Sequence, residues 1–166
     1  MQFLNYFFAS IISFLGLLMG MVLIRIAPEE QKPLEKYFIL YRRILLLMIF
    51  AFLLFYYFKN FFIFFTLAVF SIFILLVEFK TRNLLRKSML AYAILGILFF
   101  LSIQNINIFI IESSLILLYG MPTASLVCKR KEKNFHKIVF YNLGFVIVAN
   151  LLYILSSYHF SFLILR

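Results

Sequence analysis

Long hydrophobic runs separated by three short clusters of Lys and Arg constrain this chain more than any other feature of its sequence. Hydrophobic residues make up 66% of its 166 residues and charged residues only 13%, whereas soluble domains average about 45–50% and roughly 25%. A soluble domain of this size must cover a large surface with polar groups. The sequence therefore predicts an integral membrane protein in which apolar runs cross the bilayer as α-helices.

Six apolar runs are long enough, or nearly so, to cross a bilayer core of roughly 30 Å. We expect one integral membrane domain over residues 1–166, an all-α bundle of six spans arranged as three helical hairpins. The alternative is a five-span bundle in which one of the two short central runs does not cross. No Lys or Arg precedes Arg25, which argues against a cleavable signal peptide. The predicted spans cover residues 3–24, 40–58, 61–78, 88–104, 108–128 and 137–157.

The basic residues predict the orientation of the bundle. All Lys and Arg residues except Lys59 and Arg166 lie in or beside the segments after the first, third and fifth spans. Short loops rich in Lys and Arg stay in the cytoplasm, so we expect a multi-pass protein of the cell membrane with both termini extracytoplasmic. The basic loops should contact anionic lipid headgroups. This placement explains the net charge of +10 without a nucleic-acid partner.

The residues available for catalysis or metal binding are few. Cys128 is the single cysteine, and the sequence contains no Asp. The predicted orientation puts His136 and His159 on opposite sides of the membrane, where they cannot share a metal ion. No phosphate-binding loop and no G-x-S-x-G motif occurs. We therefore predict a protein that is not an enzyme and has no metal site and no cofactor.

Glu112, followed by Ser113, is the first candidate for a polar site inside the membrane. An ionisable side chain within a span is costly and marks a functional site by default. One interpretation is a carboxylate that binds a proton or cation and faces a cavity. The other is an interfacial carboxylate in the first turns of the fifth span, bonded to Ser113 or Asn107.

Pro122 and Asn150 are further candidates for this site. Pro122 cannot donate a hydrogen bond to the carbonyl of Leu118, so we expect a kink or local unwinding of the fifth span. Broken helices line the sites of many transporters, although a purely structural bend is the alternative. Asn142 and Asn150 lie on one face of the sixth span and should form hydrogen bonds to the fifth.

Small residues form a stripe along the first span. Ala9, Ser13, Gly16 and Gly20 follow one another at intervals of four, three and four residues. Small side chains let helix backbones approach closely. The stripe predicts close packing within the chain, with dimerisation as the alternative.

The first cytoplasmic segment contains Glu29, Glu30 and Lys32. Pro28 suits the first turn of a helix, and apolar residues at helical spacing follow it, which predicts a short interfacial helix leading into the second span. The segment is either a simple elbow with solvated charges or a docking surface for a cytoplasmic partner.

Two functions remain open. The first is a non-enzymatic membrane subunit or scaffold that packs against another membrane protein. The second is a transporter or substrate-binding component for a small solute or ion, built around Glu112 and the helix break at Pro122. A polar cavity at Glu112 favours transport, whereas a closed interior with an exposed apolar flank favours the subunit.

Overall fold

The computed structural model describes residues 2–81, 83–128 and 135–164, and within these ranges the regular structure is helical throughout. Side chains are described as far as Ser157, without that of Phe135. Some residues used in the sequence predictions lie outside the described part of the chain. These are Arg82, residues 129–131, Lys133, Arg166 and the side chain of His159. The helices are α1 (Phe3–Ile26), α2 (Gln31–Tyr56), α3 (Phe61–Lys80), α4 (Leu84–Leu101), α5 (Ile106–Val127), α6 (Phe135–Asn142) and α7 (Gly144–Ile164), with short 3₁₀ turns at Tyr57–Lys59 and Ser102–Gln104.

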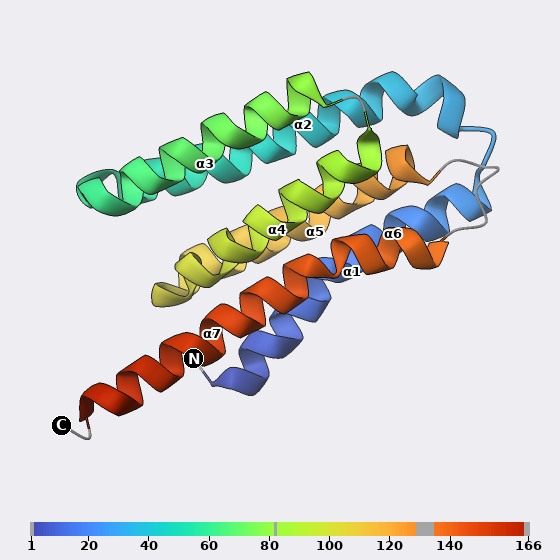
Figure 1. Ribbon diagram of the computed structural model, residues 1–166. Coiled ribbons are helices and arrows are strands. Elements are labelled where there is room, and N and C mark those ends of the chain that lie inside the picture. Colours follow the sequence, from blue (N-terminus) through green and yellow to red (C-terminus); the bar gives the residue numbers. More distant parts are fainter. Residues whose placement is uncertain (1, 82, 129–134, 165–166) are drawn as a thin grey trace.

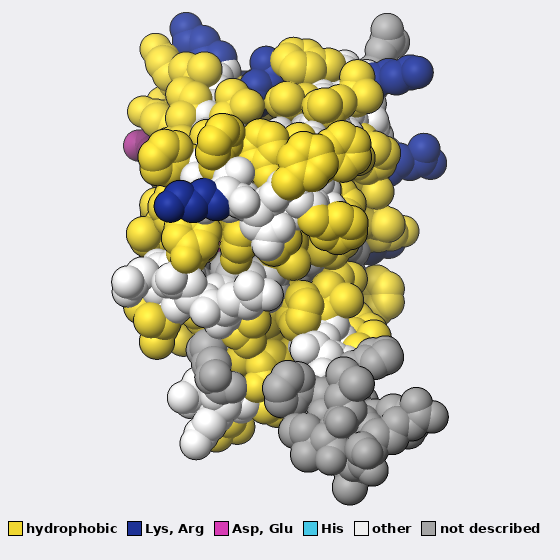
Figure 2. Space-filling view, turned by 90° about the vertical axis from the view of Figure 1, so that its left-hand side faces the viewer, with side chains coloured by type: hydrophobic (Ala, Val, Ile, Leu, Met, Phe, Trp, Pro, Cys, Tyr) yellow, Lys and Arg dark blue, Asp and Glu magenta, His cyan; other side chains and the backbone are white. Residues whose placement is uncertain are grey.

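The all-helical prediction with six spans is confirmed. Six helical stretches are long and apolar enough to cross a membrane, the sixth being formed by α6 and α7 together. Hydrophobic side chains cover much of the molecular surface, as Figure 2 shows for one face. Such a surface is stable in a bilayer, because lipid tails are as apolar as the side chains that they meet.

Asparagine side chains mark the starts of three helices. Asn60 precedes α3, Asn83 precedes α4 and Asn105 precedes α5, and each side-chain oxygen accepts hydrogen bonds from backbone N–H groups of the first turn. Such a cap satisfies donors that lack a partner within the helix and contributes about 1 kcal/mol. The chain can therefore reverse direction within very short connections.

The helices form three layers (Figure 1): α2 with α3, α4 with α5, and α1 with α6 and α7. Although the chain runs back and forth as predicted, the strongest packing is not between the helices of the predicted hairpins. The closest packing joins α1 to α5 and α4 to α7. These partners are parallel, because an odd number of membrane crossings lies between the two helices of each pair: three between α1 and α5, and one between α4 and α7.

Glycines allow the close approach of α1 and α5. A Cβ atom on Gly16 would overlap the backbone carbonyl of Leu117, and one on Gly20 would overlap that of Met121. Gly120 of α5 in turn lies against the backbone of Gly16. Small residues thus bring the two backbones into contact, as the stripe in the first span predicts. Of the other stripe residues, Ser13 is buried and Ala9 is partly buried in the core.

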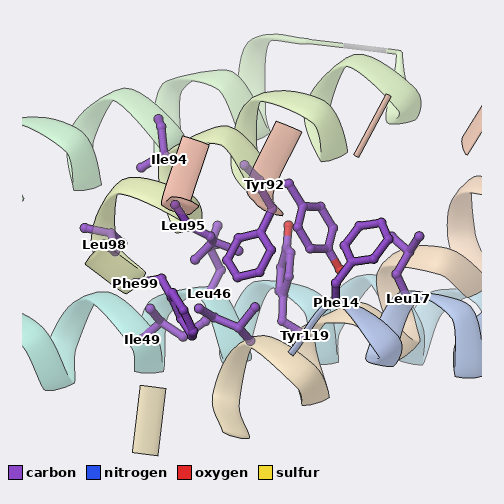
Figure 3. Packing of buried hydrophobic residues seen from close by; sticks show 14 of the residues in the cluster. Phe14, Leu17, Leu46, Ile49, Tyr92, Ile94, Leu95, Leu98, Phe99 and Tyr119 are labelled. Atoms are coloured by element: carbon purple, nitrogen blue, oxygen red, sulfur yellow. The ribbon is translucent and has the colours of Figure 1, made fainter. Parts of the chain in front are cut away.

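The core between the layers is rich in aromatic residues. Figure 3 shows residues of α1, α2, α4 and α5 converging around Tyr92 and Tyr119, whose ring centroids are 5.8 Å apart. Phe14 packs edge-on against Tyr92 at 6.1 Å.

The second span differs from its prediction, because α2 begins at Gln31 and continues without a break to Tyr56. No separate interfacial helix precedes it, so that prediction was wrong. Pro33, rather than Pro28, lies in the first turn, where its missing N–H is harmless. The start of α2 extends past the end of α3 (Figure 1).

Candidate functional site

A cluster of charged residues lies inside the bundle where α2, α3 and α4 meet. Arg42 of α2 is 2% exposed, and its Nη2 atom is 2.5 Å from Oε2 of Glu78 in α3. Arg43 Nε and Lys87 Nζ lie 3.6 and 3.8 Å from the other oxygen, Oε1. Lys87 also donates a hydrogen bond to the backbone carbonyl of Glu78. We call these four residues the basic cluster; its three cations share one carboxylate.

Local structure explains how the cluster is assembled. Arg42 and Arg43 are consecutive on α2, so their side chains leave the helix about 100° apart and approach Glu78 from two sides. The Arg43 guanidinium also lies over the ring of Phe79, 5.4 Å from its centroid. The short connection between α3 and α4 places Lys87, in the first turn of α4, back beside Glu78. On the other side, Arg42 Nε donates to the Tyr119 hydroxyl at 3.4 Å.

Sequence reasoning missed this cluster. It assigned Arg42, Arg43 and Lys87 to the cytoplasmic segments and did not single out Glu78. The available signal was an acidic residue near the end of a span whose other residues are nearly all apolar. That signal does not reveal which cations meet Glu78, because they come from two other helices.

Glu112 forms a second buried polar centre. Glu112 is 0% exposed, and among the described residues neither of its carboxylate oxygens has a hydrogen-bond partner. The Ser102 hydroxyl approaches it but donates to the Phe99 carbonyl at 2.9 Å. Ser113 instead donates to Phe109 of its own helix. Glu112 is thus enclosed by the bundle and is bonded to neither Ser113 nor Asn107, the partners that the interfacial interpretation expected.

The other predicted site residues do not join Glu112. Pro122 is ten residues away on α5, which corresponds to about 15 Å along the helix axis. The α5 helix continues through Pro122 without local unwinding, and a kink at this position stays a prediction. Asn150 donates to the Ser10 hydroxyl of α1 at 3.1 Å rather than to α5. A single site formed by Glu112, Pro122 and Asn150 is therefore absent from the described part of the chain.

Pro122 instead lines an apolar groove between α1, α2 and α5, with a volume of about 550 Å³. Gln31 lies at its polar end and donates to the carbonyls of Ser125 and Cys128 at 2.9 and 2.7 Å. These bonds satisfy carbonyls at the end of α5 that have no partner within the helix. Glu112 is not one of the lining residues, so the groove and the buried carboxylate are separate features.

The remaining candidates lie at the same end of the bundle as Gln31. Glu29, Glu30 and Lys32 are exposed, and Glu30 lines the mouth of the groove. Among the described residues, no three His, Cys, Asp or Glu side chains gather as a metal site would require.

No family model, curated protein or solved structure matches the chain. The class of protein to which the chain belongs follows from the six apolar helical stretches. The chain is a multi-pass membrane protein. What it does beyond that must be argued from the arrangement of its buried charges and its exposed helices.

Proposed function

We propose that this protein is a non-enzymatic subunit or scaffold of a membrane assembly in the cell membrane, and that α3 meets the partner. The observation that carries this proposal is the sparse burial of α3. Three of its residues are buried, Leu67, Ile74 and Glu78, whereas twelve are buried in α5. The exposed large side chains of α3 are Phe61, Phe62, Phe65, Val69, Ile72, Phe73, Leu76 and Phe79.

The exposed flank of α3 has the composition of an interface. Phe is enriched where proteins associate, and here Phe side chains extend along the whole helix. Within a membrane, helices associate by close packing of side chains and by buried polar contacts. The flank therefore fits an apolar transmembrane helix of another protein.

The closed interior supports the same proposal. The aromatic core fills the space between the layers, and Glu112 does not line the apolar groove. The continuous α5 helix lacks the unwound segment that transporters use to bind substrates.

A site-specific photo-crosslinker tests the proposal in native membranes. A photoreactive residue at Phe65 should yield an adduct of one defined mass, because the α3 flank contacts one partner. The same residue at Ile12, which is 53% exposed on α1, should yield none. Val69→Trp should reduce copurification of that partner, and Ile12→Trp should not. Equal crosslinking at both positions would contradict the proposal.

A cation-binding component is the second candidate, because Glu112 is fully buried without a hydrogen-bond partner among the described residues. An isolated buried carboxylate is stable only when it is protonated or paired with a cation. Melting of the wild type, Glu112→Gln and the exposed Glu35→Gln should be compared with and without Na⁺, K⁺ or Mg²⁺. The subunit proposal expects the same cation response in all three. Stabilisation that disappears only in Glu112→Gln would support the transporter.

A further inference from the structure

We propose that the basic cluster (Arg42, Arg43, Glu78 and Lys87) is a binding site for one phosphate-bearing anion, whose natural source is an anionic phospholipid headgroup of the cytoplasmic leaflet. This inference does not depend on the partner proposed for α3. It concerns a single bound lipid rather than the general attraction between basic loops and the membrane surface.

The charges of the cluster are not balanced. Three cations lie within 4.0 Å of Glu78, and Glu78 is the one carboxylate that ion-pairs with them in the described part of the chain. Two positive charges are therefore left without a counter-ion, and two of the three cations, Arg42 and Lys87, are buried. Buried charges are costly unless they are paired, so the cluster favours an additional anion.

The cluster also has an unused hydrogen-bond donor. Within the described structure, the buried Nε of Arg43 has no hydrogen-bond partner. Guanidinium groups bind phosphate oxygens through paired N–H groups. The Arg43 guanidinium thus offers the cluster a donor group suited to phosphate.

The cluster lies at the depth of a phosphate group and is reachable from the surface. Glu78 is seventeen residues from Phe61 at the other end of α3, which corresponds to about 26 Å along the helix. With Phe61 at one boundary of a bilayer core of roughly 30 Å, the opposite boundary passes close to Glu78. The Arg43 side chain is 43% exposed, and Lys80 and Arg86 are exposed nearby. An incoming headgroup can therefore reach the Arg43 guanidinium.

Binding can be measured on the full chain in mild detergent. Native mass spectrometry after addition of phosphatidylglycerol should show one retained lipid per chain, and thermal melting should shift upward. Phosphatidylcholine should give neither effect, because its headgroup has no net charge. If inorganic phosphate competes with the lipid at equal concentration, the site takes a soluble anion instead. No retained lipid and no shift with either anion would overturn the proposal.

Arg43→Gln is the decisive variant, because Arg43 is the most exposed cation of the cluster and the Arg42–Glu78 pair remains. Its loss should weaken phosphatidylglycerol binding about fivefold, the effect of one basic residue at an anionic surface. The matched control is Lys36→Gln, which removes an exposed positive charge from the same helix, α2. This variant should bind phosphatidylglycerol as the wild type does. If Arg43→Gln binds like the control, or only lowers the melting temperature equally with and without lipid, the cluster is a structural clamp and the proposal fails.

Discussion

Arg42 and Glu78 form an ion pair inside the bundle that joins α2 to α3, with 2.5 Å between Nη2 and Oε2. Their side chains are 2% and 8% exposed. Few other buried residues hold α3 in place, so this pair and its neighbours fix the position of the helix that we propose as the partner-binding flank.

We expect Glu78→Gln to destabilise the folded bundle by about 3 kcal/mol, because removing one member of a buried pair leaves the other charges uncompensated. Thermal aggregation and denaturant unfolding in detergent measure this loss. Glu35→Gln removes an exposed carboxylate of α2 and should have little effect. Equal stability of the two variants would show that solvent reaches the cluster.

Replacing both members of the pair is a sharper test. Arg42→Met combined with Glu78→Met removes the Arg42–Glu78 charges together, and well-packed apolar replacements of buried pairs are often tolerated. The double variant should be more stable than Glu78→Gln. A double variant that is less stable than Glu78→Gln would mean that the pair itself, rather than charge balance, holds α3.

Gly16→Ala should destabilise the protein by about 1–3 kcal/mol, the usual cost of an overpacked contact. The new Cβ would overlap the carbonyl of Leu117 and force α1 away from α5. Gly144→Ala is the matched control, because a Cβ there meets no atom within 4 Å. Melting temperatures should fall for Gly16→Ala and stay level or rise for Gly144→Ala. If Gly16→Ala matches the wild type, the two backbones are not in contact.

Two tyrosines of the aromatic core should respond differently to loss of their hydroxyl group. Tyr119→Phe removes the acceptor of the Arg42 Nε hydrogen bond, and a hydrogen bond to a charged group contributes about 1.5–3 kcal/mol. Tyr92→Phe removes a hydroxyl without a partner among the described residues, so its stability in lipid-free detergent should be unchanged or higher. The opposite order of unfolding midpoints would contradict this assignment of partners.

The orientation can be tested with single cysteines in a Cys128→Ser background. Gln104→Cys lies at the predicted extracytoplasmic end, and Lys32→Cys and Lys80→Cys lie at the predicted cytoplasmic end; all three positions are exposed. An impermeant thiol reagent should label only Gln104→Cys in intact cells, and the other two after permeabilisation. Labelling of Lys32→Cys in intact cells would invert the orientation.

Much of the fold could be predicted from the sequence. The apolar runs predict membrane helices because a backbone in lipid must satisfy its hydrogen bonds internally. Most ends of the spans lie within a few residues of the predicted positions, and the start of the second span is the main exception. That exception arose because exposed Lys32 and Lys36 precede the apolar part of a helix that starts at Gln31.

The candidate site could be predicted only in part. Glu112 stands out in the sequence, but its burial depends on other helices closing around it. Asn150 was expected to meet α5 and instead meets Ser10 of α1. Glu78 was not singled out because its partners are distant in the sequence.

By itself, then, the sequence determined that the protein lies in a bilayer, that it is helical and how many spans it has. These properties depend on local composition and backbone hydrogen bonding. Only the tertiary structure decided which helices are neighbours and which charges are enclosed. In a bilayer, a side chain facing lipid and one facing the protein interior are equally apolar. Hydrophobicity therefore does not distinguish the buried face of a helix, and the positions of Arg42, Glu78 and Glu112 follow from packing alone.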